Sequence, residues 1–425
     1  MPFRTALSGL NAASTDLRVI GNNVANAGTT GYKKSRTEFS DIFPASNLGS
    51  SATSAGSGVK VASLSQQFNQ GNIEFTDNNL DLAISGQGFF RLNDNGTTIY
   101  SRAGAFGIDR QGFVVNSANQ RLTAFQANAA GNITGALGDL RLDTSDIAPS
   151  ASTLVNVSAN LDSNQASFPA YPGGVAFDPL DPSTFNHSSS LTAYDSLGNP
   201  ILATMYFRKN DNANEWETHL WISNDTGLAS EIVPAGNAAG EPAVLNFDSA
   251  GKLASVVPSV GGTLAVDYQP VNPLTGSADM LLDLEFDNTT QFGSGFSVNS
   301  LVQDGYSSGQ LSGIDIDDSG IVQSRYTNGQ SRVFAQVVVA NFSNTQGLQQ
   351  LGDTSWSETF SSGAALVGAP GTASLGRIQS GALEGSNVDL TEQLVNMITA
   401  QRNFQANAQV ITTADAITQT IINIR

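Results

Sequence analysis

The chain has 425 residues, only 13% of them charged, and its formal net charge is −18. The length predicts roughly two to four domains, and the acidic balance argues against nucleic acid as a partner, because phosphate binding needs clustered Lys and Arg. The lack of cysteine excludes disulfides, thiol catalysis and thiolate metal sites. No stretch approaches the apolar length of a membrane span, so we expect no membrane insertion.

Residues 1–27 carry the pattern of one amphipathic helix. Pro2 suits the first helical turn, and Gly28 is well placed to end the helix. Between them an apolar residue recurs every three or four positions, as in a helix that packs against another helix. This stripe consists of Phe3, Leu7, Leu10, Ala13, Leu17, Ile20 and Val24. The stretch lacks the apolar run of a cleavable signal peptide, so if the chain leaves the cell, we expect it to use a route that does not read one.

The middle of the chain is predicted to be rich in β-strands. Short apolar runs alternate with turn pairs such as Asn95-Gly96, the usual sequence pattern of hairpins. Acidic residues far outnumber basic ones between 146 and 300, which indicates a solvated, outward-facing domain. The expected strands include Leu80–Ile84, Phe89–Leu92, Thr98–Tyr100, three strands within 186–223, and Arg332–Phe342 with Val333, Ala335, Val337 and Val339 on one face.

Residues 386–425 predict a second and longer helix. Ser386, followed by Asp389, matches a capping box, and no Gly or Pro interrupts the stretch behind it. The apolar spacing is close to the 3.5 residues of a coiled coil. The stripe consists of Leu390, Leu394, Met397, Ala400, Phe404, Ala408, Ile411, Ala414, Ile417, Ile421 and Ile424. We interpret both stripes as surfaces for packing between copies, although ordinary core helices would carry the same pattern.

These patterns together predict an α+β, mostly β fold in a discontinuous multidomain chain with coiled-coil-like helices at both ends. Stretches rich in Ser, Ala and Gly next to the two helices indicate matching joints. The expected parts are a helical assembly domain (1–30 and 386–425), connecting segments (31–70 and 361–385), an inner β domain (71–145 and 301–360) and an outer β domain (146–300).

Two motifs suggest chemistry but lack the residues to perform it. Gly305–Gly309 matches a nucleophile elbow, yet the histidines His187 and His219 both precede it, whereas the elbow needs a later one. Asp315–Gly320 resembles the start of a calcium loop, but Tyr326 stands where the bidentate Glu belongs. We therefore expect no catalytic, cofactor or metal site, and no enzyme.

Three motifs in order along the chain resemble those of the bacterial flagellar rod and hook protein family. The first combines Leu7–Ala12, Ile20–Asn26 and Thr29–Lys33, the second is Leu80–Phe90 (LDLAISGQGFF), and the third runs from Glu384 to Asn407 with the sequence QRNFQAN at its end. The insert at 146–300 resembles the outer domain of hook subunits, which the shorter distal rod subunits lack. The resemblance therefore favours a hook subunit, with a distal rod subunit as the alternative.

The resemblance implies a structural role outside the cell. Such a subunit is exported by the flagellar type III apparatus and polymerises into a flexible helical tube, a universal joint that transmits torque from rod to filament. The implied partners are other copies of the chain, the distal rod, the hook cap protein, the hook–filament junction protein and the export apparatus. The implied assembly residues are Phe3, Leu7, Leu10, Leu17, Ile20, Asn22, Asn23, Val24, Asn26, Leu390, Leu394, Met397, Phe404, Ile411, Ile417, Ile421 and Ile424.

One alternative comes from another class of protein, a secreted β-rich adhesin. It would account for the acidic middle and for aromatic residues such as Trp216 and Trp221, if these are exposed. Glu215 and Glu217, two positions apart, share one face of an expected strand, and we interpret them as a solvated face rather than as a glycosidase pair. The adhesin would not explain the paired terminal stripes.

Overall fold

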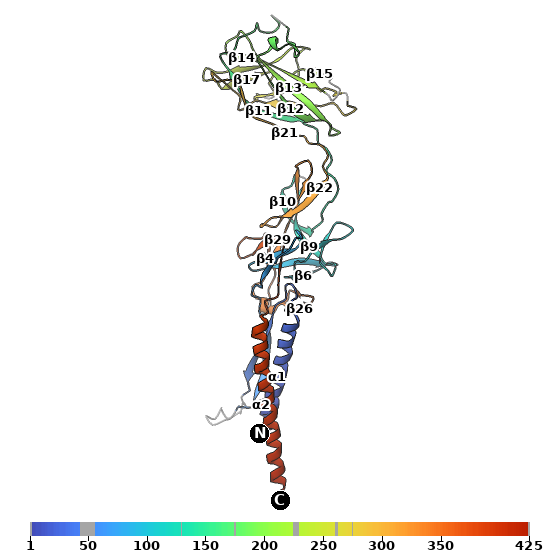
Figure 1. The fold of residues 1–425 in the computed structure, drawn as a ribbon, viewed down its shortest axis with the longest axis vertical. Helices are drawn as coiled ribbons and strands as arrows, with labels where there is room; N and C mark the ends of the chain where they lie inside the picture. The colour runs from blue at the N-terminus through green and yellow to red at the C-terminus, as the bar shows by residue number, and fades with distance from the viewer. Residues whose placement is uncertain are drawn as a thin grey trace. The chain divides into compact units, whose positions relative to one another are not determined.

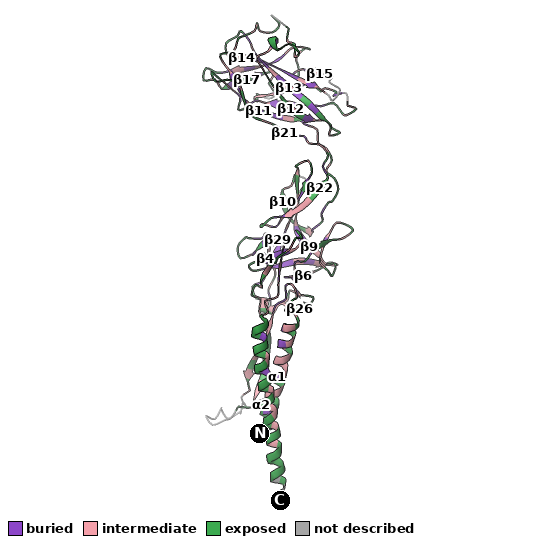
Figure 2. Ribbon diagram, viewed as in Figure 1, coloured by how far each residue is buried: buried purple, intermediate pink, exposed green. Residues whose placement is uncertain are grey.

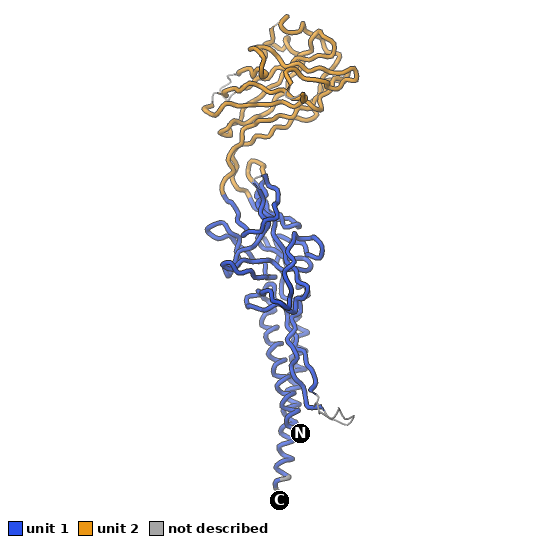
Figure 3. The backbone as a smooth tube through the Cα atoms, turned by 180° about the vertical axis from the view of Figure 1, so that it is seen from behind, with its two compact units in different colours: residues 1–144, 313–325, 331–425 blue, residues 145–312, 326–330 orange. Residues whose placement is uncertain are grey.

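The chain forms two compact units in the computed structural model (Figure 3). Unit 1 consists of Met1–Thr144, Gly313–Arg325 and Ser331–Arg425, and unit 2 consists of Ser145–Ser312 and Tyr326–Gln330. The structure describes residues 2–42, 56–128, 130–173, 176–223, 229–259, 262–273 and 275–423. Unit 2 is thus inserted into unit 1, and the segment expected to be the outer domain, 146–300, lies within it.

Two helices form the terminal part of unit 1 (Figure 1). α1 spans Pro2–Ala25 and α2 spans Leu390–Asn423, so both predicted helices are confirmed. The predicted cap at Ser386 is wrong, because Asp389 holds that position. Its Oδ1 accepts hydrogen bonds from the backbone N–H groups of Thr391 (2.8 Å) and Glu392 (3.1 Å), the free donors of the first turn.

The two helices pack in antiparallel register. Asn23 near the end of α1 hydrogen-bonds Gln393 near the start of α2, and a Cβ added to Gly9 would lie 2.5 Å from Asn407 Oδ1. The interval from Gly9 to Asn23 equals that from Gln393 to Asn407, so one register holds along the pair. Continued to Pro2, it places the start of α1 opposite Ala414, and residues 415–423 of α2 extend beyond α1.

The β-rich part of unit 1 is built on one large sheet. Its path runs β22-β23-β24-β9-β5-β6-β27-β26, with β7, β8, β10, β25 and β28 attached, and the pairs β1–β2, β3–β30 and β4–β29 lie outside it. The core gathers buried Leu82, Phe90, Leu122, Val322 and Val337, and beside it Trp356 packs with Phe89 edge to face. The bounds are β1 Ser35–Asp41, β2 Val59–Gln66, β3 Ile73–Phe75, β4 Leu82–Ser85, β5 Phe89–Asp94, β6 Thr97–Ser101, β7 Gly107–Ile108, β8 Val114–Val115, β9 Arg121–Ala127, β10 Ile133–Asp139, β22 Leu311–Ile316, β23 Ile321–Tyr326, β24 Ser331–Val337, β25 Val339–Asn341, β26 Gln349–Gly352, β27 Ser355–Ser357, β28 Leu366–Gly368, β29 Arg377–Ser380 and β30 Ala382–Glu384.

The predicted strand Arg332–Phe342 is divided in the structure. β24 ends at Val337 and pairs with β9, whereas β25 begins at Val339 and pairs with β5. The chain changes partners between them while Val337, Val338 and Val339 all stay buried. The sequence gives no sign of this change of partner, because the residues on both sides of the break are apolar and the run continues without a polar or turn residue.

Unit 2 contains two sheets that share one core. β18-β19-β11-β20 with β21 form the first sheet, and β12-β13-β14-β16-β17 with β15 form the second. Alternate residues point inward, such as Val155 and Leu161 on β11 and Met205 and Phe207 on β13. The bounds are β11 Leu154–Asp162, β12 His187–Tyr194, β13 Pro200–Lys209, β14 Glu215–Ser223, β15 Ala229–Ile232, β16 Ala243–Phe247, β17 Leu253–Val257, β18 Ala265–Asp267, β19 Asp283–Glu285, β20 Thr290–Phe292 and β21 Ser297–Gln303.

Two expectations about β14 are wrong. Trp216 is fully buried in the core of unit 2, so it is no exposed aromatic. Glu217 is also buried, near Arg208 (3.8 Å), and it accepts a hydrogen bond from the backbone N–H of Tyr171 (2.9 Å). A loop covers this face of the strand, which the pattern of β14 alone does not reveal.

Candidate functional site

The α1 stripe is only partly covered by α2. Ile20 is buried, and Leu10, Leu17 and Val24 are intermediate, but Phe3 and Leu7 remain about half exposed. Small residues make the close seam, since Ala6, Ala12 and Ala13 are buried on α1. The first turns of α1 therefore keep apolar side chains in solvent.

The α2 stripe is more exposed still (Figure 2). Ala400 and Gln393 are buried against α1, and Met397, Phe404 and Ile411 are intermediate. Three further members of the predicted set, Leu390, Leu394 and Ile417, are about half exposed and therefore lie outside the contact between α1 and α2. Ile424 lies outside the described residues, as does the side chain of Ile421.

Four exposed apolar residues of α2 outside the predicted stripe escaped the sequence analysis. Val395, Ile398, Val410 and Ile422 are all exposed. They could have been found by plotting the whole helical wheel instead of a single stripe, because α2 carries apolar residues on more than one side. Together with the exposed members of the predicted stripe, they leave apolar side chains in solvent on more than one side of α2, which suits a helix that several partners contact.

The predicted asparagines tie the end of α1 to the segments beside it. Asn23 is buried, and its Nδ2 donates to the Ser35 carbonyl (2.8 Å) and to Gln393 (3.1 Å), while its Oδ1 accepts from the Ser35 N–H (2.9 Å). Asn22 Oδ1 accepts from the hydroxyl of Tyr32 (2.8 Å), and Asn26 Nδ2 donates to the Asn22 carbonyl (2.9 Å). These bonds fix the direction in which the chain leaves the helix.

A buried ionic cluster joins the two chain ends to the β-rich part of unit 1. Lys33 Nζ lies 2.6 Å from Glu384 Oε1 and Arg102 Nη1 lies 2.9 Å from Glu384 Oε2, and the side chains of Lys33 and Glu384 are fully buried. Arg102 also donates to the carbonyls of Ile84 (3.3 Å) and Gly86 (2.7 Å). We name Lys33, Arg102 and Glu384 the junction cluster. It was missed because its members are far apart in sequence.

Burial governs the protonation of the junction cluster. Desolvation lowers the pKa of Lys33, and the nearby Glu384 carboxylate opposes that shift. Desolvation likewise lowers the pKa of Arg102, again opposed by Glu384. One carboxylate thus holds two cations out of water, which is stable only while all three groups keep their geometry.

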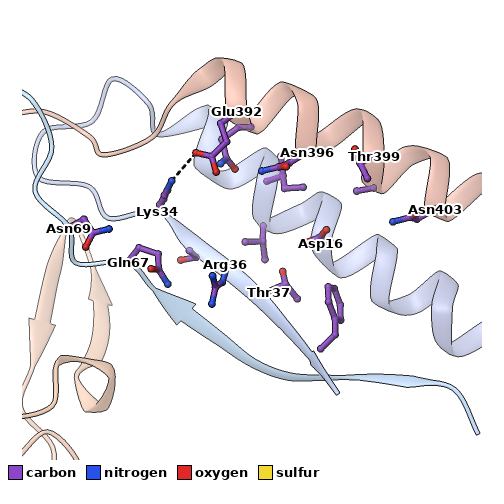
Figure 4. A pocket seen from close by; sticks show the side chains of 16 residues that line it. Asp16, Lys34, Arg36, Thr37, Gln67, Asn69, Glu392, Asn396, Thr399 and Asn403 are labelled. Carbon is purple, nitrogen blue, oxygen red and sulfur yellow. Dashed lines mark hydrogen bonds and ion pairs between the residues drawn. The ribbon is translucent and has the colours of Figure 1, made fainter. Parts of the chain in front are cut away.

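A polar groove of about 390 Å³ lies between α1, the start of α2 and β1 (Figure 4). Lys34 Nζ pairs with Glu392 Oε2 across it (3.0 Å), and Asn396 and Asn403 line it from α2. Amide and hydroxyl groups dominate the lining, so the groove suits a polar protein segment more than a small apolar ligand.

Of the two motifs that suggested chemistry, only Asp315–Gly320 is a turn, whereas Gly305–Gly309 runs extended, with Tyr306 bridging Ser150 and Gly309 bridging Ile147. Asp317 Oδ1 accepts from the N–H groups of Ser319 and Ile321 (both 2.9 Å), an Asx-type turn between β22 and β23. Within the described ranges no group of three or more His, Asp or Glu is placed to hold a metal ion. Neither α1 nor the described part of α2 combines the length and apolarity that a membrane span requires.

Comparison with known families matches the chain in four consecutive parts. "Flagella basal body rod protein" covers residues 3–33 and "Flagellar basal body rod FlgEFG protein C-terminal" covers 379–424. Between them, "Flagellar hook protein FlgE/F/G D1 domain" covers 83–160 and "Flagellar basal body protein FlaE D2 domain" covers 160–306. Together they define an axial protein of the bacterial flagellum.

Full-length relatives narrow that class. The flagellar hook protein FlgE of Salmonella typhimurium is 38% identical over 100% of both chains, and that of Escherichia coli is 37% identical over the same share. A crystal structure of Helicobacter pylori flagellar hook protein FlgE2 shares the fold, with a TM-score of 0.55 over 73% of this chain and 100% of the other, at 14% identity. The chain belongs to the flagellar hook protein family.

Proposed function

We propose that this chain is the structural subunit of a flagellar hook, exported by the flagellar type III apparatus and polymerising into a flexible helical tube outside the cell. The observation that carries the proposal is the terminal helix pair within a full-length match to hook proteins. A pair that leaves Leu394, Ile398 and Ile417 in solvent gains stability when further helices cover them.

The assembly residues named from the sequence fall into two groups, those that pack within one chain and those that remain exposed for neighbouring copies. Ile20, Met397 and Phe404 pack within one chain, whereas Phe3, Leu7, Leu390, Leu394 and Ile417 are available to neighbouring copies. A copy that uses different patches to contact its neighbours builds an open helix rather than a closed ring.

The proposed partners follow from the place of a hook in the flagellum. They are the distal rod at one end, the hook–filament junction protein and the cap protein at the other, and the export apparatus that delivers the chain. The domain assignment is proposed along with them: helices at 1–30 and 386–425, connecting segments at 31–70 and 361–385, an inner β domain and an outer β domain.

Electron microscopy of basal bodies isolated after deletion of the gene tests the proposal. Complete rods without hooks are expected, and a plasmid copy of the gene should restore the hooks. Truncated rods would instead assign the chain to the rod. Intact hooked flagella would remove it from the flagellar axis.

A further inference from the structure

The turn at residues 359–362 holds a phenylalanine that none of the described residues of its own chain covers. Phe360 is fully exposed, whereas Ser362 beside it is completely buried. A single exposed apolar residue is ordinary on a protein surface. The way in which this turn is held makes Phe360 different.

Hydrogen bonds brace the turn from several directions. Thr359 Oγ1 donates to the Gly347 carbonyl (2.6 Å), Ser362 Oγ donates to the Thr359 carbonyl (2.8 Å), and Asn344 Nδ2 donates to the Ser361 carbonyl (3.0 Å). The turn also lies against Gly347, where an added Cβ would come within 2.5 Å of the Ser361 carbonyl carbon. A rigid turn presents its aromatic ring at little further entropic cost, which is the property of a binding anchor.

The same unit carries a surface groove suited to receive such a ring. It has a volume of about 340 Å³, and we name it the Arg18 groove. Its apolar lining includes the half-exposed Leu64 together with Val19 and the ring of Tyr32. Among its described lining residues, Thr15, Arg18, Val19, Asn22, Tyr32, Ser35, Leu64 and Gln350, Arg18 alone is charged.

The charges of the two surfaces are complementary. The stretch 343–376 around Phe360 contains Asp353 and Glu358 but no Lys or Arg. An Arg18 guanidinium that met this stretch would meet no positive charge, and it could approach Glu358, whose Oε2 also accepts a hydrogen bond from the Tyr100 hydroxyl of its own chain (3.1 Å). The guanidinium can also stack on an aromatic ring. Since Phe360 is fully exposed, it does not occupy the groove of its own chain.

We propose that Phe360 of one copy inserts into the Arg18 groove of a second copy of this chain. The inference rests on the proposed hook function, because it names one contact of that polymer. The anchor and the groove are different patches of one chain, so the contact is heterologous and propagates instead of closing. Each copy would use its Phe360 on one neighbour and its groove on another.

Disulfide trapping tests the contact directly, since the native chain has no cysteine. One variant carries Ser361→Cys beside the anchor and another carries Thr15→Cys in the groove. Equal amounts are polymerised together, oxidised, and run on a non-reducing gel. Cross-linked dimers are expected for this mixture, and far fewer for Ser361→Cys mixed with Thr97→Cys, an exposed position on β6. Equal yields, or no dimers in intact polymer, would overturn the proposal.

A second measurement compares Phe360→Ala with Leu180→Ala, which replaces a highly exposed apolar residue in unit 2. Phe360→Ala should raise the critical concentration for polymerisation about tenfold or more, with an unchanged melting curve of the monomer. Leu180→Ala should change neither quantity. If the native chain and Phe360→Ala polymerise equally, the contact is refuted while the hook function stands. If the native chain does not polymerise at all, the hook function itself fails.

Discussion

The helix pair and the β-rich parts of the chain differ in how completely each buries its own apolar residues. The core of unit 2 encloses Trp216, Phe207 and Phe286 without any partner. The helices bury little more than alanines and Ile20, and they leave long side chains such as Ile398 and Val410 in solvent. The β-rich parts are thus complete in one copy, whereas the helices depend on further copies for part of their core.

The junction cluster lies where these two kinds of structure meet, and disrupting it should have the largest effect. Glu384→Gln leaves Lys33 and Arg102 as buried cations without a carboxylate. We expect the free energy of unfolding of unit 1 to fall by about 3–5 kcal/mol. Chemical denaturation followed by fluorescence measures this when Trp216 and Trp221 are replaced by Phe, because the remaining Trp356 lies in unit 1.

Glu392→Gln is the matched control for that variant. It also removes a carboxylate from a lysine, Lys34, but this pair is partly exposed. Exposed ion pairs contribute about 0–1 kcal/mol, so the control should lose little stability. If both variants lost the same free energy of unfolding, burial of the junction cluster would not account for its contribution to the stability of unit 1.

The junction cluster also shows where prediction from sequence ends. Helices and strands follow local periodicity, so both helices and the three strands of 186–223 could be predicted. Lys33 and Glu384 are 351 residues apart. In the sequence, each of them looks like an ordinary charged surface residue. Folding brings these residues together. A charged residue is buried only where a partner compensates it, and here that partner is distant in sequence. The Phe360 turn was hidden for the same reason, since its braces come from Asn344 and Gly347.

A smaller effect is expected at high pH in the self-sufficient β-rich part of unit 1. Burial, and then the nearby Glu358, raise the pKa of Tyr100 to about 12 from its ordinary value of 10.0. Below pH 10 both folded and unfolded chains keep this proton, so its contribution to stability is complete. As pH rises from 10 towards 12 the unfolded chain loses the proton first, and unit 1 should lose about 2–3 kcal/mol.

Tyr100→Phe isolates that contribution. It keeps the ring that packs on Phe342 but cannot ionise. The difference in unfolding free energy between the native chain and this variant should be flat below pH 10 and should change through the window up to 12. A difference that stays constant across the whole range would contradict the assignment.

The smallest effect on the single chain is expected where the helices are least covered. Ile417 lies beyond the register partner of Pro2 and is about half exposed. Ile417→Ser should therefore change the free energy of unfolding of the monomer by no more than about 0.5 kcal/mol, while polymerisation, measured by sedimentation and electron microscopy, should be strongly reduced. Ala400→Ser, at the buried seam between α1 and α2, should instead weaken the monomer. If Ile417→Ser polymerises like the native chain, neighbouring copies do not cover the apolar residues at the end of α2. Dependence on other copies would then be limited to the first turns of α2.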